Sequence, residues 1–154
     1  MEFQFQGDDH SIMIYYPSAA GGVAWNYIGT KLAPGSVDQI AWVWHIEPHG
    51  HSKVKDLELN WHTNSVDQLC WDPKHADLIA TASGDKNVCL WDVCSEKCSH
   101  QAELSGENIN ITYKQDGTHV AVGNRVNEIA WNMSGDMFFL TTLPSCAGNP
   151  SLTL

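Results

Sequence analysis

Three histidines with a carboxylate between them are the first residues in the chain that could bind a transition metal. His45, His49 and His51 lie in one short stretch together with Glu47. A His-x-His pair can present two imidazole nitrogens to one ion, and imidazole suits zinc, copper and nickel. The same stretch also fits a polar connector between two strands. We favour the connector and predict no metal here.

A second group, Cys94, Cys98 and His100 with Cys89 nearby, has the ligand types of a zinc site. The Cys-x3-Cys-x-His run has no second Cys or His pair at the spacing of a zinc finger. It also falls on a predicted hairpin turn, where neighbouring side chains point to different faces. We therefore predict thiols that are exposed or packed in strands, with no metal and no cofactor.

A nucleophile and a base also occur close together, at Cys70 and His75. A hydrolase needs both groups and a third that orients the base. Cys70 directly precedes Trp71 in an apolar run, which favours a small core residue. The adjacent Gly21 and Gly22 lack the following Gly-Lys pair of a phosphate loop. The sequence therefore predicts no catalytic residue and no enzyme.

The composition fits one folded domain and excludes several classes of protein. The 154 residues are 43% hydrophobic and 17% charged, unlike a disordered tail or a charge-rich coiled coil. Eight basic and 18 acidic residues give a net charge of −10. A nucleic-acid binder needs Lys and Arg to neutralise phosphates. We therefore expect contact with nucleic acid only indirectly, through a protein partner.

The first residues do not resemble an export signal. Glu2, Asp8 and Asp9 are acidic where a signal peptide is basic. The longest apolar run, 12–25, is interrupted by Pro17 and two glycines and is too short and polar to span a bilayer. We expect an intracellular protein without membrane contact, in which the five cysteines are reduced.

An internal repeat with an offset of 47 residues is the most informative pattern. The stretches 32–38 and 79–85 match, and each is followed six residues later by a tryptophan, Trp44 or Trp91. Each unit opens with a short apolar strand that ends in an aromatic residue: Trp25, Trp71, Tyr113 and Trp131. Four short strands per unit at this period predict an all-β protein built of propeller blades.

The turns between the strands set the expected boundaries. Asp116-Gly117 and Ser134-Gly135 are hairpin pairs, because glycine readily takes a positive φ. We expect second strands at 78–83, 119–123 and 137–142, and in the second unit a third strand at 87–93, a turn at 95–97 and a fourth strand near 101–104. The blades would span about 23–59, 60–104, 105–125 (partial) and 126–142 (partial), with a divergent segment 1–22 and an unrelated segment 143–154.

An early His62, the turn residue Asp85 and the pair Trp91-Asp92 complete a pattern that resembles the WD-repeat family of β-propellers. The resemblance implies that a histidine, a hydroxyl of the second strand, the turn aspartate and the tryptophan hydrogen-bond to one another. By position the structural residues would be His62, Ser83 (or Thr81), Asp85, Trp91 and Asp92, with Asp38 and Trp44 as counterparts in the first unit. Their role would be structural, since buried polar side chains must be paired.

Several stretches resemble a narrower group, the WD-repeat subunits of the THO complex, especially in plants. These stretches are 65–71, 81–86, 106–111, 126–129 and 137–141. The resemblance implies a nuclear, non-catalytic THO/TREX scaffold that binds other protein subunits and acts in messenger RNA processing and export coupled to transcription. The alternatives are a WD-repeat adaptor of another complex, such as a ubiquitin-ligase substrate receptor or a histone binder, and a degenerate fragment without a function of its own.

The chain departs from the repeat pattern in its third unit. The aromatic residues that end the opening strands are spaced by 46 and 42 residues, but Tyr113 and Trp131 only by 18. The third unit therefore lacks about two dozen residues near Arg125, enough for its third and fourth strands. We predict an incomplete propeller of about three blades whose ring does not close. Its end blades would expose apolar side chains, namely Trp25, Trp42, Trp131, Phe138 and Phe139, and would favour association.

Overall fold

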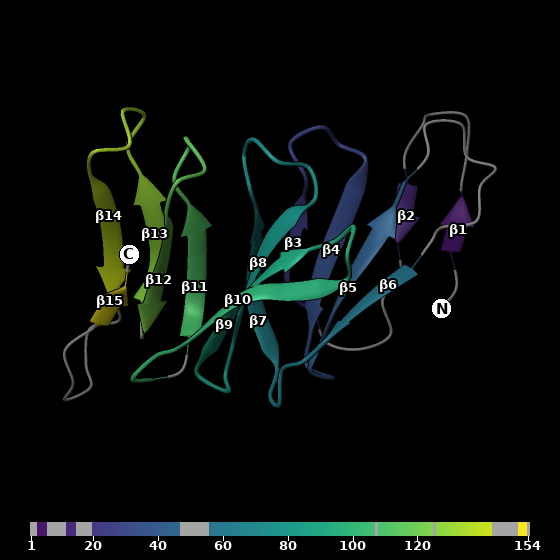
Figure 1. Cartoon of the computed structure of the whole chain (residues 1–154), viewed down its shortest axis with the longest axis horizontal. Helices are drawn as coiled ribbons and strands as arrows, with labels where there is room; N and C mark the ends of the chain where they lie inside the picture. Colours follow the sequence, from purple (N-terminus) through teal and green to yellow (C-terminus); the bar gives the residue numbers. More distant parts are fainter. Residues whose placement is uncertain are drawn as a thin grey trace.

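A computed structural model describes residues 3–5, 12–14, 20–46, 56–106, 108–124, 126–142 and 151–153. Every regular element in these ranges is a β-strand, and all of the strand pairs are antiparallel (Figure 1). These ranges contain no helix long and apolar enough to cross a membrane. The predicted all-β fold is confirmed.

The first sheet has four strands in the order in which they occur along the chain. They are β3 (Ala20–Trp25), β4 (Lys31–Ser36), β5 (Ile40–His45) and β6 (Asp56–Asn60). The sheet thus begins at Ala20, inside the segment 1–22 that we expected to be divergent. Pro34 lies inside β4 without a backbone N–H to donate, and pairing with β5 resumes at Gly35 opposite Ala41.

The second sheet is the complete four-stranded unit that the repeat predicted, at 66–103. It consists of β7 (Val66–Trp71), β8 (Leu78–Ser83), β9 (Asn87–Asp92) and β10 (Lys97–Glu103). The predicted turn and fourth strand are present, but the strand starts earlier than the expected 101–104, because β10 begins at Lys97. A register shift between Cys98 and His100 and the exposure of this edge strand hide its periodicity in the sequence.

The third sheet differs most from the expectation. It pairs β11 (Asn108–Tyr113) with β12 (Val120–Asn124), and β12 with β15 (Ser151–Thr153). We expected no strand to pair with β12 on that side and an unrelated segment after 142. Instead, a segment from the far end of the chain contributes three residues to the open edge of β12.

Two two-stranded sheets complete the described chain. The fourth sheet pairs β13 (Val126–Trp131) with β14 (Phe138–Thr142), and a separate hairpin pairs β1 (Phe3–Phe5) with β2 (Ile12–Ile14). Within the described ranges, the fourth sheet therefore consists of the first two strands of a repeat unit.

The four main sheets stand side by side in chain order (Figure 1). Their first strands form one row, because β3 packs against β7, β7 against β11, and β11 against β13. The first and fourth sheets stand at opposite ends of this row, so the ring is not closed. This arrangement is an incomplete propeller.

The core is divided between the junctions of consecutive sheets. Ala33, Val43 and Leu59 of the first sheet pack with Leu69 and Trp91 of the second. A smaller cluster joins the second sheet to Ile111 and Val122 of the third, and a third joins Ala121 to Ile129. Each sheet is therefore held mainly by its neighbours in the row, as expected for a repeat protein.

Glycines permit the close approach of the first two sheets. A Cβ atom at Gly21 would lie 2.5 Å from the carbonyl oxygen of Val66, and one at Gly35 would lie 2.6 Å from the same atom. Neither distance is possible for a real side chain next to backbone. The inner strand of the second sheet therefore requires glycine at both positions of the first sheet.

Candidate functional site

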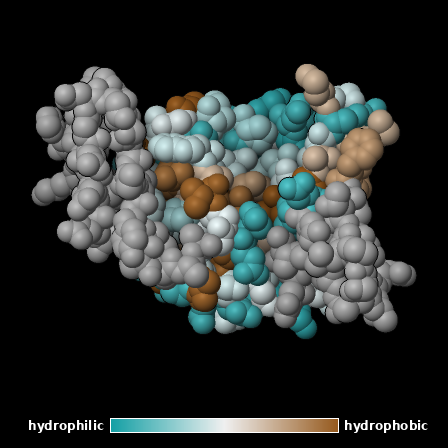
Figure 2. All heavy atoms as spheres, turned by 180° about the vertical axis from the view of Figure 1, so that it is seen from behind, coloured by the Kyte–Doolittle hydropathy of each residue, from teal (hydrophilic) through white to brown (hydrophobic). Residues whose placement is uncertain are grey.

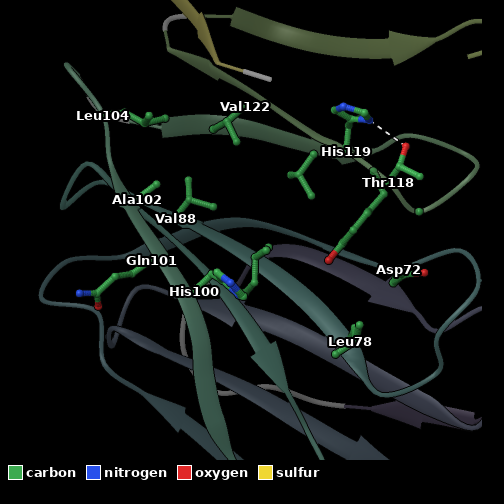
Figure 3. A pocket seen from close by; sticks show the side chains of 14 residues that line it. Asp72, Leu78, Val88, His100, Gln101, Ala102, Leu104, Thr118, His119 and Val122 are labelled. Atoms are coloured by element: carbon green, nitrogen blue, oxygen red, sulfur yellow. Dashed lines mark hydrogen bonds between the residues drawn. The ribbon is translucent and has the colours of Figure 1, made fainter. Parts of the chain in front are cut away.

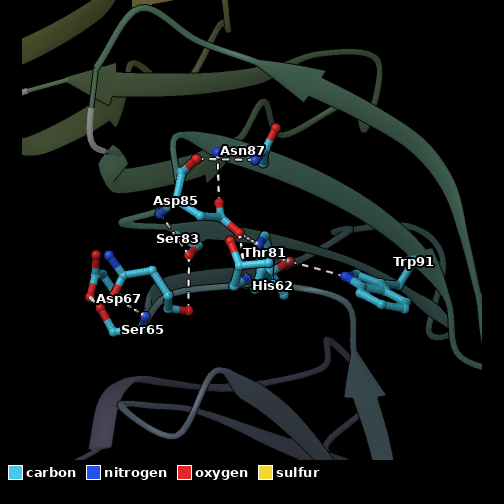
Figure 4. A network of polar contacts seen from close by, with 10 residues as sticks. His62, Ser65, Asp67, Thr81, Ser83, Asp85, Asn87 and Trp91 are labelled. Atoms are coloured by element: carbon cyan, nitrogen blue, oxygen red, sulfur yellow. Dashed lines mark hydrogen bonds and ion pairs between the residues drawn. The ribbon is translucent and has the colours of Figure 1, made fainter.

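A buried chain of hydrogen bonds runs through the second sheet (Figure 4). The indole nitrogen of Trp91 lies 3.0 Å from the Thr81 hydroxyl, which lies 2.8 Å from Nε2 of His62. Nδ1 of His62 lies 3.0 Å from Oδ2 of Asp85. We call these four residues the His62 network.

Strands and turns of one sheet bring these residues together. Thr81 and Trp91 lie on the neighbouring strands β8 and β9, while Asp85 lies in the turn between them. His62 comes just before β7 and is 3% exposed. The backbone amides of Thr63 and Asn87 donate to Asp85 at 2.9 and 2.8 Å, so its carboxylate also closes the turn.

The electrostatics of the network assign its protons. Burial lowers the pKa of His62, although the hydrogen bond to Asp85 opposes this shift. Burial disfavours ionised Asp85, but hydrogen bonds from Thr63, Asn87 and His62 outweigh it and lower its pKa. At neutral pH His62 is therefore neutral and Asp85 is charged. The polar side-chain atoms of the network all form hydrogen bonds with other groups of the same sheet, which gives the network a structural role.

The structure decides between the two hydroxyls that the sequence left open. Thr81 joins the network, and Ser83 does not. The Ser83 hydroxyl donates to the carbonyl oxygen of Asn64 at 3.1 Å and accepts from the backbone amide of Asp85 at 3.1 Å. Asp92 lies outside the network and accepts from the amide of Cys94 in the next turn.

The counterparts in the first sheet are arranged differently. Trp44 is buried at the place of Trp91, but Pro34 occupies the place of Thr81 and has no hydroxyl. Asp38 is exposed, and its carboxylate accepts from the amide of Ile40 at 3.3 Å within its own turn. Among the described residues, the first sheet therefore has no hydroxyl at the position from which Thr81 links the tryptophan to the histidine.

The residues after the opening strands form polar links between sheets, which the sequence analysis missed. Asn26 is 3% exposed and accepts from the backbone amides of Thr30 and Lys31 in its own turn. It also donates to the carbonyl oxygen of Ala76, in the turn between β7 and β8 of the second sheet. Trp71 reaches back, donating from its indole nitrogen to the carbonyl oxygen of Ala24 at 2.9 Å. The recurrence of a polar residue directly after each strand-ending aromatic was the available signal.

The same position in the next units also contacts the following sheet. Asp72 is 2% exposed and accepts from the backbone amides of Lys74 and His75. A Cβ at Gly117 would lie 3.1 Å from Asp72, and one at Gly135 would lie 2.8 Å from Lys114. The hairpin turn of each sheet thus packs against the polar residue of the preceding one.

The possible metal and nucleophile residues are not assembled into a site. His49, His51 and Glu47 lie outside the described residues, whereas His45 is exposed at the end of β5. Cys94 is in a turn, and Cys98 and His100 are on β10. Within the described ranges no three His, Cys, Asp or Glu side chains gather as metal ligands. Desolvation raises the pKa of Cys70 to about 12, so this thiol is not ionised at neutral pH.

The apolar side chains expected at the ends of the row differ in exposure. Trp25 is 48% exposed and Phe139 is 66% exposed, while Trp42, Trp131 and Phe138 are half-buried. Met133 and Met137 add to the exposed surface of the fourth sheet, and apolar surface is visible on that side in Figure 2. The expected exposure at the end sheets is therefore found for Trp25 and Phe139, and is smaller for the other three residues.

Comparison with solved structures defines the class of fold. The WD40 domain of coronin from Toxoplasma gondii superposes with a TM-score of 0.64 at 16% identity, covering 70% of this chain and 29% of that structure. Together with the open row of sheets, this likeness shows that the chain folds as an incomplete WD-repeat propeller. No model of a protein family matches the chain.

Comparison with curated proteins gives a closer likeness. The chain is 67% identical to THO complex subunit 3 of Arabidopsis thaliana over 143 positions, covering 78% of this chain and 45% of the relative. WD repeat-containing protein AAC3 of Dictyostelium discoideum is 29% identical over 77% of this chain and 33% of its own length. The chain thus spans less than half the length of these relatives.

The match to the Arabidopsis protein also bears on the short third unit. The matched stretch is 143 positions long but takes up 78% of the 154 residues, which is about 120. About 23 positions of the stretch therefore have no counterpart in this chain. This number agrees with the two dozen residues by which the repeat spacing is short.

Proposed function

We propose that the chain is a non-catalytic protein-interaction scaffold of the THO type. It would act in messenger RNA processing and export coupled to transcription, in the nucleus, with other protein subunits of the THO complex as partners. The observation that carries the proposal is the 67% identity to THO complex subunit 3 over 78% of the chain. The sequence stretches that resemble THO subunits support the same reading.

The chemistry of the described residues is consistent with a scaffold. The buried polar groups of the His62 network are used to join strands to one another. The Cys70 thiol is held in its protonated form. The net charge of −10 disfavours direct binding to phosphates and favours basic protein surfaces. Nucleic acid would therefore be reached indirectly.

The experiment is capture by the complex. The full chain, carrying an affinity tag, is co-expressed with the other THO subunits of Arabidopsis, and the retained subunits are quantified. We expect retention above that of a matched Trp91→Ala variant, in which the His62 network is broken. Retention equal to that of the variant, or selective retention of histone-binding or ubiquitin-ligase components from nuclear extract, would contradict the proposal.

A further inference from the structure

A groove of about 540 Å³ lies between the second and third sheets (Figure 3). Apolar side chains dominate its two walls: Val88, Leu90, Ala102 and Leu104 on one side, and Tyr113, Val120 and Val122 on the other. His100 and His119 also line it, and Asp72 is its one acidic residue among those described. The groove thus lies beside β12, the second strand of the short third unit.

The wall on the second sheet has a covered counterpart in the first sheet. With the offset of 47 residues, Val88 and Leu90 take the places of Ala41 and Val43. Across the sheet, Ala102 pairs with Val88 as Leu59 pairs with Ala41, and His100 pairs with Leu90 as Leu57 pairs with Val43. The two walls are therefore equivalent, position by position.

The first of these walls is covered by alternate residues of a third strand. Val43, Leu57 and Leu59 pack in one cluster with Cys89, Trp91 and Val93, which are on or directly after β9. The next sheet thus supplies a large aromatic side chain flanked by smaller apolar ones two residues away. To be covered in the same way, the equivalent wall at the groove needs a large aromatic side chain with smaller apolar residues two positions before and after it.

In the part of the chain that the structure describes, the third sheet has no strand that places an aromatic side chain over this wall, because β15 covers only part of the edge of β12. Tyr113 pairs with Val120 as Trp71 pairs with Ile79, so Val120 takes the place of Ile79. In the second sheet Trp91 stands opposite Ile79. In the third sheet β15 pairs with Val122, Gly123 and Asn124, and it does not reach Val120. The position opposite Val120, where Trp91 would lie in the second sheet, therefore opens into the groove.

We propose that this groove binds an extended segment of another protein, which adds antiparallel to β12 and inserts a large aromatic side chain flanked by apolar residues at i−2 and i+2. Addition of a strand to an exposed sheet edge supplies backbone hydrogen bonds, while the groove selects alternate side chains. The net charge of −10 favours a segment that is basic at its solvent-facing positions.

A second copy of the chain is a poor source of this segment. The two tryptophan-bearing third strands, β5 and β9, are each paired on both sides within their own sheets. Releasing one of them would unfold the sheet that contains it. The binding proposed here does not depend on THO subunits being the partners, so the two proposals can fail separately.

Binding of the segment competes with β15, because both use the edge of β12 at Val122. A proline at Leu152, the middle residue of β15, would remove a backbone donor and disfavour its pairing. The Leu152→Pro variant should therefore bind the segment more tightly than the unmodified chain. Comparing the affinities of the Leu152→Pro variant and the unmodified chain tests whether the segment binds at the edge of β12, with the walls of the groove left unchanged.

The probe is a labelled peptide that copies residues 86–93 of this chain, the strand that carries Trp91, with Cys89→Ala and with Asp92→Lys to supply a basic residue at a solvent-facing position. Its fluorescence anisotropy is followed on titration with the full chain. We expect saturable binding, weaker by about tenfold or more for the peptide with Trp91→Ala, because loss of a buried aromatic anchor commonly has that effect.

Two variants of the full chain carry the same Ala→Glu substitution, one inside the groove and one outside it. Ala102→Glu puts a carboxylate on an exposed groove position of β10, and Ala130→Glu puts one on an exposed position of β13. We expect loss of binding for the first variant and no change for the second, with both melting as the parent does. Equal affinity of both variants, equal affinity of the two peptides, or no binding even to Leu152→Pro, would overturn the proposal.

Discussion

Trp91 donates a hydrogen bond from its indole nitrogen to the hydroxyl of Thr81 at 3.0 Å, and this contact sets the direction of the whole His62 network. An indole nitrogen can only donate, so the hydroxyl donates onward to Nε2 of His62. The other ring nitrogen then carries the proton that Asp85 accepts. The Thr81 hydroxyl thus links β9, through His62 and Asp85, to the turn that precedes this strand.

Removal of this hydroxyl should weaken the second sheet. Thr81→Val keeps the shape of the side chain but leaves the Trp91 donor and the His62 acceptor unsatisfied. We expect a loss of about 1–3 kcal/mol in the free energy of unfolding, the usual cost of orphaned buried polar groups. Urea unfolding, followed by tryptophan fluorescence, measures it.

Thr81→Ser is the control, because it retains the hydroxyl. It should lose less stability than Thr81→Val, and its indole environment should be closer to that of the parent. If Val at this position is as stable as Ser, the hydrogen-bond chain does not stabilise the sheet.

The turn aspartates of the first two sheets form a second matched pair. Asp85→Ala removes the acceptor of His62 and of two backbone amides, and we expect a loss of about 1–3 kcal/mol. Asp38→Ala, at the exposed counterpart, should change the free energy of unfolding by less than about 0.5 kcal/mol. Thermal or urea unfolding of both variants checks the difference, and equal losses would refute the assigned role of Asp85.

The stability of the sheet should fall with acid. Burial lowers the pKa of His62 below its ordinary value of 6.5, so the unfolded chain binds this proton at a higher pH than the native chain does. The free energy of unfolding therefore falls as the pH drops below 6.5 towards the native pKa. Asp85 adds a second loss below 3.8, because its native pKa is lowered too. Urea unfolding between neutral and mildly acidic pH should show the first decline, and His62→Gln should flatten it.

A metal analysis tests the interpretation of the His and Cys groups. We expect less than one zinc per purified chain after dialysis, since neither group has four ligands at a structural spacing. Elemental analysis of the parent and of Cys94→Ser measures this. One tightly held zinc per chain that is lost in the variant would show that the cysteine run binds metal.

Local sequence patterns predicted much of the fold. Apolar runs ending in Trp25, Trp71 or Trp131 identified the opening strands, and the offset between Trp44 and Trp91 identified the repeat. These features are local or periodic, so the sequence records them directly. The order of strands within the first two sheets then follows from short antiparallel connections.

Other features depend on contacts that no local pattern contains. Thr81 and Ser83 are two residues apart on one strand and point to the same side, so only the position of His62 selects Thr81. The start of β10 at Lys97 is hidden because an exposed edge strand needs no apolar alternation. The pairing of β15 with β12 joins residues about thirty positions apart and carries no turn signal between them.

Lengthening the third unit tests most directly the claim that this chain is a THO-type scaffold whose third repeat unit is short of its own third and fourth strands. A stretch of about 23 residues, taken from the third repeat unit of the Arabidopsis relative, is inserted between Arg125 and Val126, where the repeat spacing of this chain is short. A scrambled stretch of equal length serves as the control. We expect the lengthened chain to retain several-fold more of the other THO subunits than the parent does, and the scrambled one to retain no more. Equal retention by all three chains would contradict the account.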